Sequence, residues 1–489
     1  MADFRGQERL LIDGELVPAA GGRTYENRNP ATEEPIGVAA DAAPADMERA
    51  IAAARRAFDE TEWSRDLAFR ARCLRQLHQA LTEERERLRQ VIVAEVGSPI
   101  ALTYAVQQDS AIEGMLYDIE VAERFPFERD LGVHEYFGMK SRRRVLYEPL
   151  GVVAAITPWN FPFMLNLAKV VPALMAGNTV VLKAAPDTPW SATVLGELAA
   201  ERTELPPGVL NVITARDPAE VGDLLTADPR VDMVSFTGST PVGKHIMARA
   251  ADTVKKVFLE LGGKSAHIVL EDAPLEAVLG GVGIGVCTHA GQGCAINTRL
   301  LLPRSRYEEG LEILTEAFRK IPYGDPTDPA NLMGPLISER QRERVEGYIR
   351  RGVEEGARLL AGGGRPAHLD RGYFVEPTLF ADVDPDATIA QEEIFGPVLA
   401  VIPFEDEEDA IRIANHSRYG LSGAISAGDL DRALAIARRI RTGTLGINGG
   451  MWFAPDSPFG GYKESGLGRE HGEEGFAEYL QTKTLGLPA

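Results

Sequence analysis

One cysteine in this sequence is a candidate for nucleophilic chemistry. Cys294 follows Gly291-Gln292-Gly293, and this flexible stretch allows the backbone to come close to a reacting carbon. A cysteine thiolate attacks carbonyl carbons, although no histidine adjacent in the sequence is present to activate this thiol. An isolated cysteine is more often a small buried hydrophobe, and Cys73 and Cys287 are interpreted in that way. Cys294 is therefore a candidate nucleophile that needs a partner.

Glu260 is the candidate partner. It stands at the end of the apolar run in VFLELGGKS, directly before two glycines. Burial at such a position raises the pKa of a carboxyl group toward the range that suits a general base. The alternative is a glutamate held in a salt bridge at the end of a strand.

The segment VDMVSFTGSTPVGKHIMARA predicts a strand, a turn and a helix. Gly238 permits a tight turn, Ser239 or Thr240 can cap the helix, and Pro241 suits its first position. Such a helix start offers unpaired N–H groups to an anion such as a pyrophosphate. The spacing from Gly238 to Gly243 departs from the usual G-x-G-x-x-G fingerprint, and a plain strand-to-helix turn explains it as well.

Two further polar residues follow apolar runs upstream. Lys183 ends the run in NTVVLKAAP and could reach a ribose hydroxyl or a phosphate, or could simply be solvated. Asn160 lies between Trp159 and Phe161 and is flanked by prolines, so it is either a hydrogen-bonding group of a site or a turn cap.

The first elements of the chain are small. Asp13-Gly14 between short apolar runs predicts a tight hairpin. Between Asp46 and Gly97, apolar residues recur at helical spacing in two groups, which predicts two amphipathic helices, the first through Met47, Ile51, Ala54 and Phe58 and the second through Leu74, Leu77, Leu81, Leu88 and Ile92.

From about Gly151 the pattern changes to short, almost wholly apolar runs separated by segments of helical length. This rhythm predicts a parallel sheet with helical crossovers, whose strands are 151–156, 179–182, 231–236, 257–261 and 266–270. A second α/β stretch follows Cys294, with helices expected at 307–321 and 339–360 and strands at 378–380 and 398–404. No linker composition separates the two, so the boundary is placed near Gly262-Gly263.

Composition limits the classes of partner. The formal charge of −20 repels phosphate backbones and anionic lipids, which argues against nucleic acid and membrane partners. We expect a soluble cytoplasmic protein, because the N-terminus has no signal-peptide pattern and no run of eighteen apolar residues occurs. The three cysteines form no C-x-x-C pair and the eight histidines are scattered, so neither a disulfide framework nor a metal site is expected.

Six motifs in order closely resemble the aldehyde dehydrogenase superfamily, and the likeness extends from the Ile12–Glu15 hairpin to the C-terminus. They are PWNFP at 158–162, FTGST at 236–240, LELGGKS at 259–265, GQGCAINTR at 291–299, EEIFGPV at 392–398 and PFGGYKESGLGRE at 458–470. The interval between Glu260 and Cys294 is also typical of the base and nucleophile of this family.

The resemblance implies roles for the catalytic candidates. Cys294 would attack the aldehyde to form a thiohemiacetal, whose oxyanion Asn160 and the Cys294 N–H would hold. Hydride transfer to the nicotinamide would leave a thioester, which water activated by Glu260 would hydrolyse to the carboxylic acid. Lys169 resembles a lysine near the active site of the family, and its task stays open.

The resemblance also implies a set of cofactor-binding residues. Glu393 would hold the nicotinamide ribose, Phe395 would pack beside the nicotinamide, and Lys183 would meet the adenosine ribose. The complete set is Ile156, Thr157, Pro158, Trp159, Lys183, Pro186, Phe236, Thr237, Gly238, Ser239, Gly243, Leu261, Gly262, Glu393 and Phe395. The family commonly has a ribose-binding glutamate where Pro186 stands, so NADP+ is a candidate beside NAD+, which we predict to be the better substrate.

The implied substrate positions are Phe161, Leu167, Trp452, Phe453 and Phe459, all apolar or aromatic. They suit an aliphatic, terpenoid or aromatic aldehyde, and they include no basic residue for the carboxylate of a semialdehyde. Core packing is the alternative for each of them.

The implied architecture is α/β, with a Rossmann-like cofactor-binding domain, an α/β catalytic domain and a small β oligomerisation element. The expected boundaries are 1–128 and 150–262 for cofactor binding, 263–473 for catalysis, and 129–149 with 474–489 for oligomerisation strands. RRRVLYEPL and YLQTKTLGL resemble the family's oligomerisation strands, so a homodimer or homotetramer is implied.

Two other functions stay open. A CoA-acylating dehydrogenase would release the acyl group to CoA, and the carboxylate at Glu260 argues against it. A non-catalytic family member kept for binding would be expected to have lost its nucleophile, whereas Cys294, Glu260 and Asn160 are all present.

Overall fold

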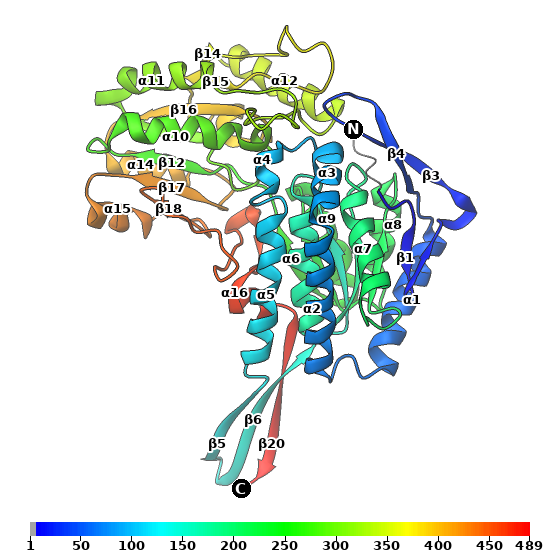
Figure 1. Cartoon of the computed structure of the whole chain (residues 1–489). Coiled ribbons are helices and arrows are strands. Elements are labelled where there is room, and N and C mark those ends of the chain that lie inside the picture. Colours follow the sequence, from blue (N-terminus) through cyan, green and yellow to red (C-terminus); the bar gives the residue numbers. More distant parts are fainter. Residues whose placement is uncertain (1–5) are drawn as a thin grey trace.

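The computed structural model describes residues 6–489 and contains two large sheets, each packed with helices, and a third sheet that projects from them (Figure 1). Residues 1–5 lie outside the described residues. They are part of the segment 1–128 predicted for cofactor binding and of the N-terminal stretch expected to contain no signal peptide. No helix in residues 6–489 is both long and apolar enough to cross a membrane.

The first sheet has eight strands in the order β19-β11-β10-β7-β8-β9-β1-β2. Its five central strands are parallel. Four of them lie where apolar runs predict strands, whereas β9 was not predicted. The predicted strand 266–270 belongs instead to the second sheet, because the chain leaves the first sheet at Gly262-Gly263. The bounds are β1 (Leu10–Ile12), β2 (Glu15–Val17), β7 (Val152–Ile156), β8 (Thr179–Lys183), β9 (Leu210–Ile213), β10 (Met233–Thr237), β11 (Lys256–Glu260) and β19 (Gly466–Leu467). β19 returns to this sheet from inside the segment 263–473, because it pairs with β11.

Helices cover both faces of this sheet. Side chains along each central strand alternate between the two faces, which explains why these strands are largely apolar. In β7, Val152 and Ile156 pack on one face with α1 (Pro44–Glu60), α8 (Pro218–Ala227) and α9 (Thr240–Ala250). Val153 and Ala155 pack on the other face with α2 (Leu67–Glu83), α3 (Arg85–Val96), α5 (Asp109–Arg124), α6 (Pro162–Met175) and α7 (Trp190–Arg202). Successive strand residues point to opposite faces, so a sheet buried on both sides needs apolar residues at every position.

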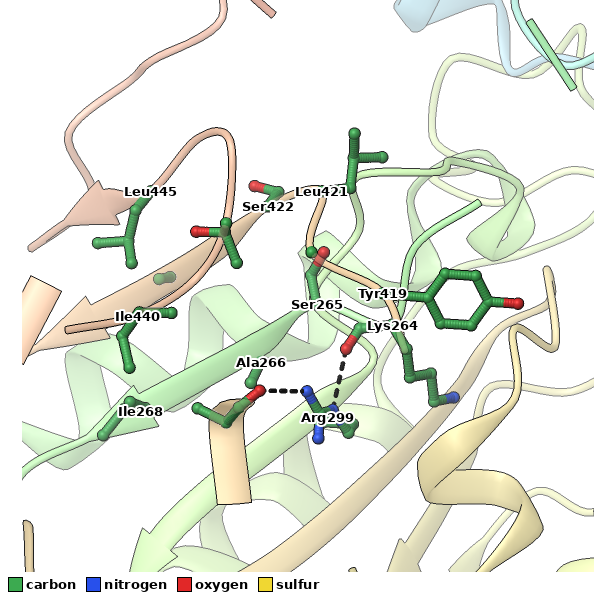
Figure 2. Close-up of a pocket in the computed structure, with 14 residues that line it drawn as sticks. Lys264, Ser265, Ala266, Ile268, Arg299, Tyr419, Leu421, Ser422, Ile440 and Leu445 are labelled. Carbon is green, nitrogen blue, oxygen red and sulfur yellow. Dashed lines mark hydrogen bonds between the residues drawn. The ribbon is translucent and has the colours of Figure 1, made fainter. Parts of the chain in front are cut away.

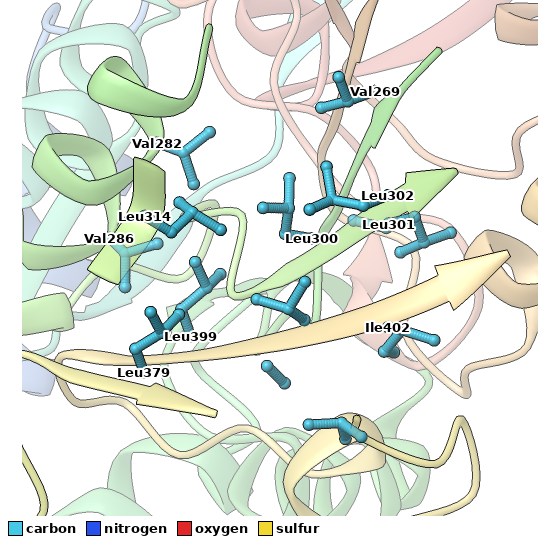
Figure 3. Close-up of a cluster of buried hydrophobic side chains, with 14 of the residues drawn as sticks. Val269, Val282, Val286, Leu300, Leu301, Leu302, Leu314, Leu379, Leu399 and Ile402 are labelled. Atoms are coloured by element: carbon cyan, nitrogen blue, oxygen red, sulfur yellow. The ribbon is translucent and has the colours of Figure 1, made fainter. Parts of the chain in front are cut away.

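The second sheet has seven strands in the order β14-β15-β16-β13-β12-β17-β18. Its bounds are β12 (Ala266–Val269), β13 (Arg299–Pro303), β14 (Arg358–Ala361), β15 (Thr378–Ala381), β16 (Val398–Phe404), β17 (Gly423–Ser426) and β18 (Gly446–Ile447). The helices around it are α10 (Leu275–Cys287), α11 (Tyr307–Arg319), α12 (Glu339–Glu354), α13 (Thr388–Gln391), α14 (Glu407–Asn415) and α15 (Leu430–Ala437). Figure 3 shows its core, where Val282 and Val286 of α10 and Leu314 of α11 face leucines of β13, β15 and β16.

The third sheet joins segments that are far apart in the sequence. β5 (Glu128–Tyr136) and β6 (Met139–Pro149) form a hairpin, and β20 (Leu480–Pro488) pairs antiparallel with β6 from Leu480 opposite Pro149 to Pro488 opposite Ser141. This sheet extends away from the rest of the chain (Figure 1). The remaining strands are β3 (Thr24–Arg28) and β4 (Pro35–Ala40), which pair in a fourth, two-stranded sheet, and the remaining α-helices are α4 (Ile100–Thr103) and α16 (Gly472–Ala477).

The predicted hairpin is present, with left-handed φ of 57° at Asp13 and 79° at Gly14 between β1 and β2. Two helix predictions need correction. The second helix predicted between Asp46 and Gly97 is in fact two helices, α2 and α3, which are separated at Glu84. The apolar spacing continues across the break because both helices bury leucines in the same core. The helix expected at 339–360 ends at Glu354, because Gly356 adopts a φ of 92° and the chain then enters β14.

Candidate active site

Cys294 lies on a tightly held loop between α10 and β13. The three residues His289, Ala290 and Gly291 have left-handed φ of 50°, 53° and 71°. The buried side chain of Gln292 fixes this loop, since its amide donates to the carbonyl of His289 and accepts from the N–H of Ile337 at 2.9 Å. The cysteine is thereby presented at the wall of a cavity rather than in the core.

Two glycines let the turn after β11 approach the cysteine loop and the loop that carries Glu393. A Cβ on Gly263 would lie 2.4 Å from the backbone oxygen of Cys294, and one on Gly262 would lie 2.3 Å from Glu393 Oε2. Glu393 also accepts a hydrogen bond of 2.9 Å from the N–H of Gly263. The backbone contact requires glycine at position 263, whereas a side chain at position 262 would have to displace the Glu393 carboxylate.

Glu260 is the last residue of β11 and is almost fully buried, and it lines the same cavity as Cys294. Burial, and next the negative charge of Glu470, raise the pKa of Glu260 to about 8. Its Oε1 atom is buried and has no hydrogen-bond partner among the described residues. A desolvated carboxyl with a free oxygen is suited to take a proton from a small molecule such as water.

The thiol of Cys294 lies close enough to Glu260 for the carboxylate to act on it. Burial raises the pKa of Cys294 well above the ordinary value for a thiol, and the negative charge of Glu260 makes the next largest contribution. The candidate nucleophile and the candidate base are therefore neighbours in one cavity, and the sequence predicts this only through their order in the motifs.

Lys169 of α6 is completely buried and forms an ion pair of 2.5 Å with Glu470 Oε1. Its ammonium group also donates to Ser235 Oγ at 3.4 Å and lies 4.9 Å from the centre of the Phe258 ring. The charges of Glu470 and Lys169 both act on the pKa of Glu260, so this ion pair influences the candidate base.

Asn160 lines the cavity beside Cys294 and is 4% exposed. The side-chain amide of Asn160 donates to the backbone carbonyl of Gln292 at 2.9 Å, and the backbone carbonyl of Asn160 accepts from the side-chain amide of Gln107 at 2.9 Å. The amide carries two N–H groups, so one is left for an oxygen atom in the cavity. The residue is therefore anchored at the site and does not act only as a turn cap.

The cavity has a volume of about 1040 Å³ and is lined largely by apolar residues. Four of the five predicted substrate residues line it, namely Phe161, Trp452, Phe453 and Phe459. Trp452 and Phe459 stack at 5.6 Å between ring centres. Leu167 does not line it and is buried in the core beneath the first sheet. Met164 and Leu165 line the cavity, whereas Leu167 lies about 200° around α6 from Leu165.

The predicted cofactor residues gather at the carboxyl edge of the eight-stranded sheet. The register places Ile156 beside both Lys183 and Phe236, and Thr237 beside Glu260. The loop residues that follow these strands are Thr157, Pro158, Trp159, Pro186, Gly238, Ser239, Leu261 and Gly262, and Gly243 lies in the first turns of α9. Ligands of open α/β sheets bind along such an edge.

α9 begins at Thr240 with Ser239 at its N-cap, and neither predicted cap makes a side-chain capping bond. A Cβ on Gly243 would lie 2.5 Å from Leu261, so the helix packs closely on the turn after β11. Phe395, which has a φ of 59°, packs edge-on against Trp159 at 5.3 Å between ring centres. Glu393 and Phe395 therefore bring the second half of the chain to the edge of the first sheet.

Lys183 is buried, and burial lowers its pKa to about 8 while the charge of Asp217 opposes that effect. Its ammonium group donates to the carbonyl of Ala184 at 3.3 Å. Asp217, which caps α8, is the only carboxylate that acts on this lysine within the described part of the chain. The sequence pattern had given no signal for Asp217.

A second, small cavity lies behind the LELGG turn (Figure 2). Its volume of about 10 Å³ is at the lower limit for one water molecule. The buried guanidinium group of Arg299 donates at 2.9 Å to the carbonyls of Lys264 and Ala414, and these bonds fix the turn to the start of β13. This region supports the site and is too small to hold a substrate.

Comparisons with known proteins place the whole chain in one family. The sequence model described as "Aldehyde dehydrogenase family" matches residues 16–485. A 3-succinoylsemialdehyde-pyridine dehydrogenase from a Pseudomonas species is 44% identical, and the alignment covers 99% of each chain. The chain belongs to the aldehyde dehydrogenase family.

Solved aldehyde dehydrogenases have the same fold. A Mycobacterium tuberculosis aldehyde dehydrogenase complexed with NAD+ is 45% identical, with a TM-score of 0.94 over 98% of both chains. A Pseudomonas syringae aldehyde dehydrogenase variant complexed with NAD+ and octanal is 37% identical, with a TM-score of 0.94 over 99% of this chain and 98% of that one. The predictions of the family, of the α/β fold and of an enzyme of this class are confirmed.

Proposed function

We propose that this aldehyde dehydrogenase oxidises an apolar aldehyde to the carboxylic acid, with Cys294 as nucleophile, Glu260 as base and NAD+ as the hydride acceptor. The observation that carries the proposal is the pairing of Cys294 with a desolvated Glu260 on the wall of one largely apolar cavity. A carboxylate beside the thiol disfavours CoA as the acyl acceptor, because it gives water a base.

The chain's own residues divide the reaction between them. Glu260 is the base beside the Cys294 thiol, whose sulfur adds to the aldehyde carbon to form a thiohemiacetal. The free N–H of the Asn160 amide and the backbone N–H of Cys294 stabilise the oxyanion. NAD+ would supply the acceptor for the hydride that leaves as the carbonyl re-forms as a thioester. Glu260 passes the thiol proton to solvent and then takes a proton from water, whose oxygen attacks the thioester carbon. Collapse of that adduct releases the acid and the Cys294 thiolate, which the protonated Glu260 restores to the thiol.

The carboxyl edge of the first sheet fits a dinucleotide. The start of α9 offers unpaired N–H groups to a pyrophosphate, and Thr237 Oγ1 is buried without a hydrogen-bond partner in residues 6–489. Glu393 would hold the nicotinamide ribose, and Lys183 with Pro186 would border the adenosine ribose. NAD+ is the cofactor named for the M. tuberculosis and P. syringae neighbours.

We propose that the enzyme prefers NAD+ over NADP+, although Pro186 stands where the family commonly has a ribose-binding glutamate. Asp217 acts electrostatically on Lys183, and its negative charge disfavours a second phosphate nearby. Initial rates with both cofactors at equal concentration test this, and a strong preference for NADP+ would contradict it.

The cavity walls favour an apolar substrate. Its lining contains no lysine or arginine among the described residues, so a carboxylated semialdehyde would find no cationic partner. The P. syringae neighbour holds octanal, and the Pseudomonas relative is named for a semialdehyde that carries a pyridine. Both names are compatible with an apolar or aromatic body on the substrate.

The third sheet is proposed as an oligomerisation element. Its β5–β6 hairpin exposes large apolar side chains, namely Val133, Tyr136, Phe137 and Met139. Pairing across subunits would cover them and the bare strand edges. Light scattering after size exclusion should give a dimer or tetramer, and a monomer would contradict the proposal.

The experiment that tests the function is NADH production, followed by absorbance, with a panel of apolar aldehydes with and without CoA. Oxidation without CoA supports the proposal. A strict CoA requirement would establish the acylating alternative, and NAD+ binding without turnover of any aldehyde would favour a binding protein.

A further inference from the structure

Helix α10 presents a row of residues with almost no side chain to the cavity. Ala277, Gly281 and Gly285 are spaced by four residues, so they lie on one helix face, and all three line the cavity. A Cβ on Gly281 or Gly285 would meet nothing within 4 Å. The space beside α10 is therefore open because the side chains are missing.

These glycines are costly for a helix, since each destabilises the helix interior relative to alanine. Packing does not account for them, because no neighbour among residues 6–489 approaches their Cβ positions. Room in the cavity does account for them, and 1040 Å³ is at the upper end of what small-molecule sites provide.

A polar pair interrupts the apolar lining. His267 of β12 and Ser426 of β17 point to the same face of the second sheet, and His267 Nε2 lies 2.8 Å from Ser426 Oγ. Both line the cavity. The second ring nitrogen of His267 makes no hydrogen bond within the described chain, and it is not among the buried unpartnered atoms, so it is accessible from the cavity.

The pair lies away from the nucleophile. β12 begins close to Gly263, which contacts Cys294, and Ser426 is opposite Val269, the last residue of β12. His267 is four residues beyond Gly263, a stretch that spans up to roughly 13 Å when extended, and neither Cys294 nor Glu260 acts electrostatically on its ring. Burial also lowers the pKa of His267 to about 4, so the ring is neutral at physiological pH.

We propose that this cavity selects aldehydes with a bulky apolar body and an uncharged hydrogen-bonding group at the far end. Gly281 and Gly285 provide the room for the body, and the His267–Ser426 pair binds the distal hydroxyl, carbonyl or ring nitrogen. A neutral imidazole donates or accepts a hydrogen bond without offering charge to a carboxylate. The inference rests on the proposed aldehyde oxidation and names its substrate class.

The first test changes the room. Gly281→Leu should lower kcat/KM for biphenyl-4-carbaldehyde by about tenfold or more and for octanal by less, because the new side chain occupies the space of the bulky body. Gly280→Leu is the matched control. It adds the same side chain to the same helix, also at a position with nothing within 4 Å, but Gly280 does not line the cavity. An unchanged ratio of the two substrates in Gly281→Leu would overturn the proposed role of the glycines.

The second test changes the distal group. Straight-chain aldehydes of increasing length, from hexanal to decanal, are compared with their ω-hydroxy and ω-carboxylate forms. At one length or more, the hydroxy form should exceed the parent in kcat/KM by about fivefold, while the carboxylate form falls below it. Ser426→Ala and His267→Phe should each reduce the hydroxy preference.

The outcomes separate the inference from the function on which it rests. If no aldehyde reduces NAD+, the proposed function fails. If aldehydes are oxidised but no hydroxy form is preferred at any length, or the preference survives both variants, the polar pair is not a binding site.

Discussion

Glycine is used in opposite ways on the two sides of Cys294. On the cofactor side, Gly262 and Gly263 are so tightly enclosed that a Cβ would lie 2.3 Å and 2.4 Å from Glu393 and Cys294. On the aldehyde side, a Cβ on Gly281 or Gly285 would meet nothing within 4 Å. The closely packed side fixes the positions of the reacting groups, and the open side leaves room for the substrate to vary.

The largest effect should follow loss of the proposed nucleophile. Cys294→Ala should lower kcat by on the order of 10⁴-fold or more, because no other thiol reaches the cavity within residues 6–489. NAD+ binding, measured by calorimetry, should persist. Residual oxidation within about tenfold of the parent enzyme would show that another group attacks the aldehyde.

A single methyl group on the closely packed side should be the next most damaging change. Gly263→Ala forces a Cβ against the backbone oxygen of Cys294, and a shift of the nucleophile by about 1 Å can cost on the order of 100-fold in kcat. Gly280→Ala, the control on the open helix, should keep full activity. Equal kcat values for the two variants would remove the distinction between the two sides.

The buried ion pair should matter for stability more than either glycine of the open side. Lys169→Met leaves Glu470 buried without its partner and should lower the free energy of unfolding by about 3–5 kcal/mol. The double variant Lys169→Met/Glu470→Gln should recover part of that loss, because no unpaired charge remains. Denaturant unfolding of the parent, single and double variants measures this, and a double variant no more stable than the single would contradict the pairing.

The most gradual expected effect is a pH dependence. Glu260 works as a base only when ionised, and its pKa is raised to about 8. Below that pH the protonated form predominates, so kcat should rise about tenfold per pH unit and level off above about 8 wherever deacylation limits turnover. A kcat that is flat from pH 6 to 9 would place the base elsewhere.

The closely packed side was the more predictable from sequence. Apolar runs predicted the parallel strands, and motif order predicted Cys294 and Glu260, because these features are local in the chain. Glu470 ends the motif at 458–470, but its pairing with Lys169 carried no local signal, since the two residues are 301 positions apart in the sequence. Asp217 was missed for the same reason, as its effect on Lys183 depends on how α8 packs beside β8.

The aldehyde side was harder to predict because its walls depend on which way each side chain points. Leu167 and Leu165 are equally apolar, and only the rotation of α6 decides that Leu165 lines the cavity while Leu167 is in the core. The glycines of α10 contribute no side chains, so their role in leaving room can be recognised only when the structure shows the open space beside them.

Rapid mixing of Glu260→Gln with saturating NAD+ and octanal tests the division of labour between Cys294 and Glu260 most directly. The account predicts a burst of NADH close to one equivalent per active site, then turnover slowed by about 100-fold or more, with an acyl group on Cys294 detectable by mass spectrometry. Loss of the burst in proportion to the steady-state rate, with no acyl-cysteine, would contradict the claim that Glu260 serves thioester hydrolysis.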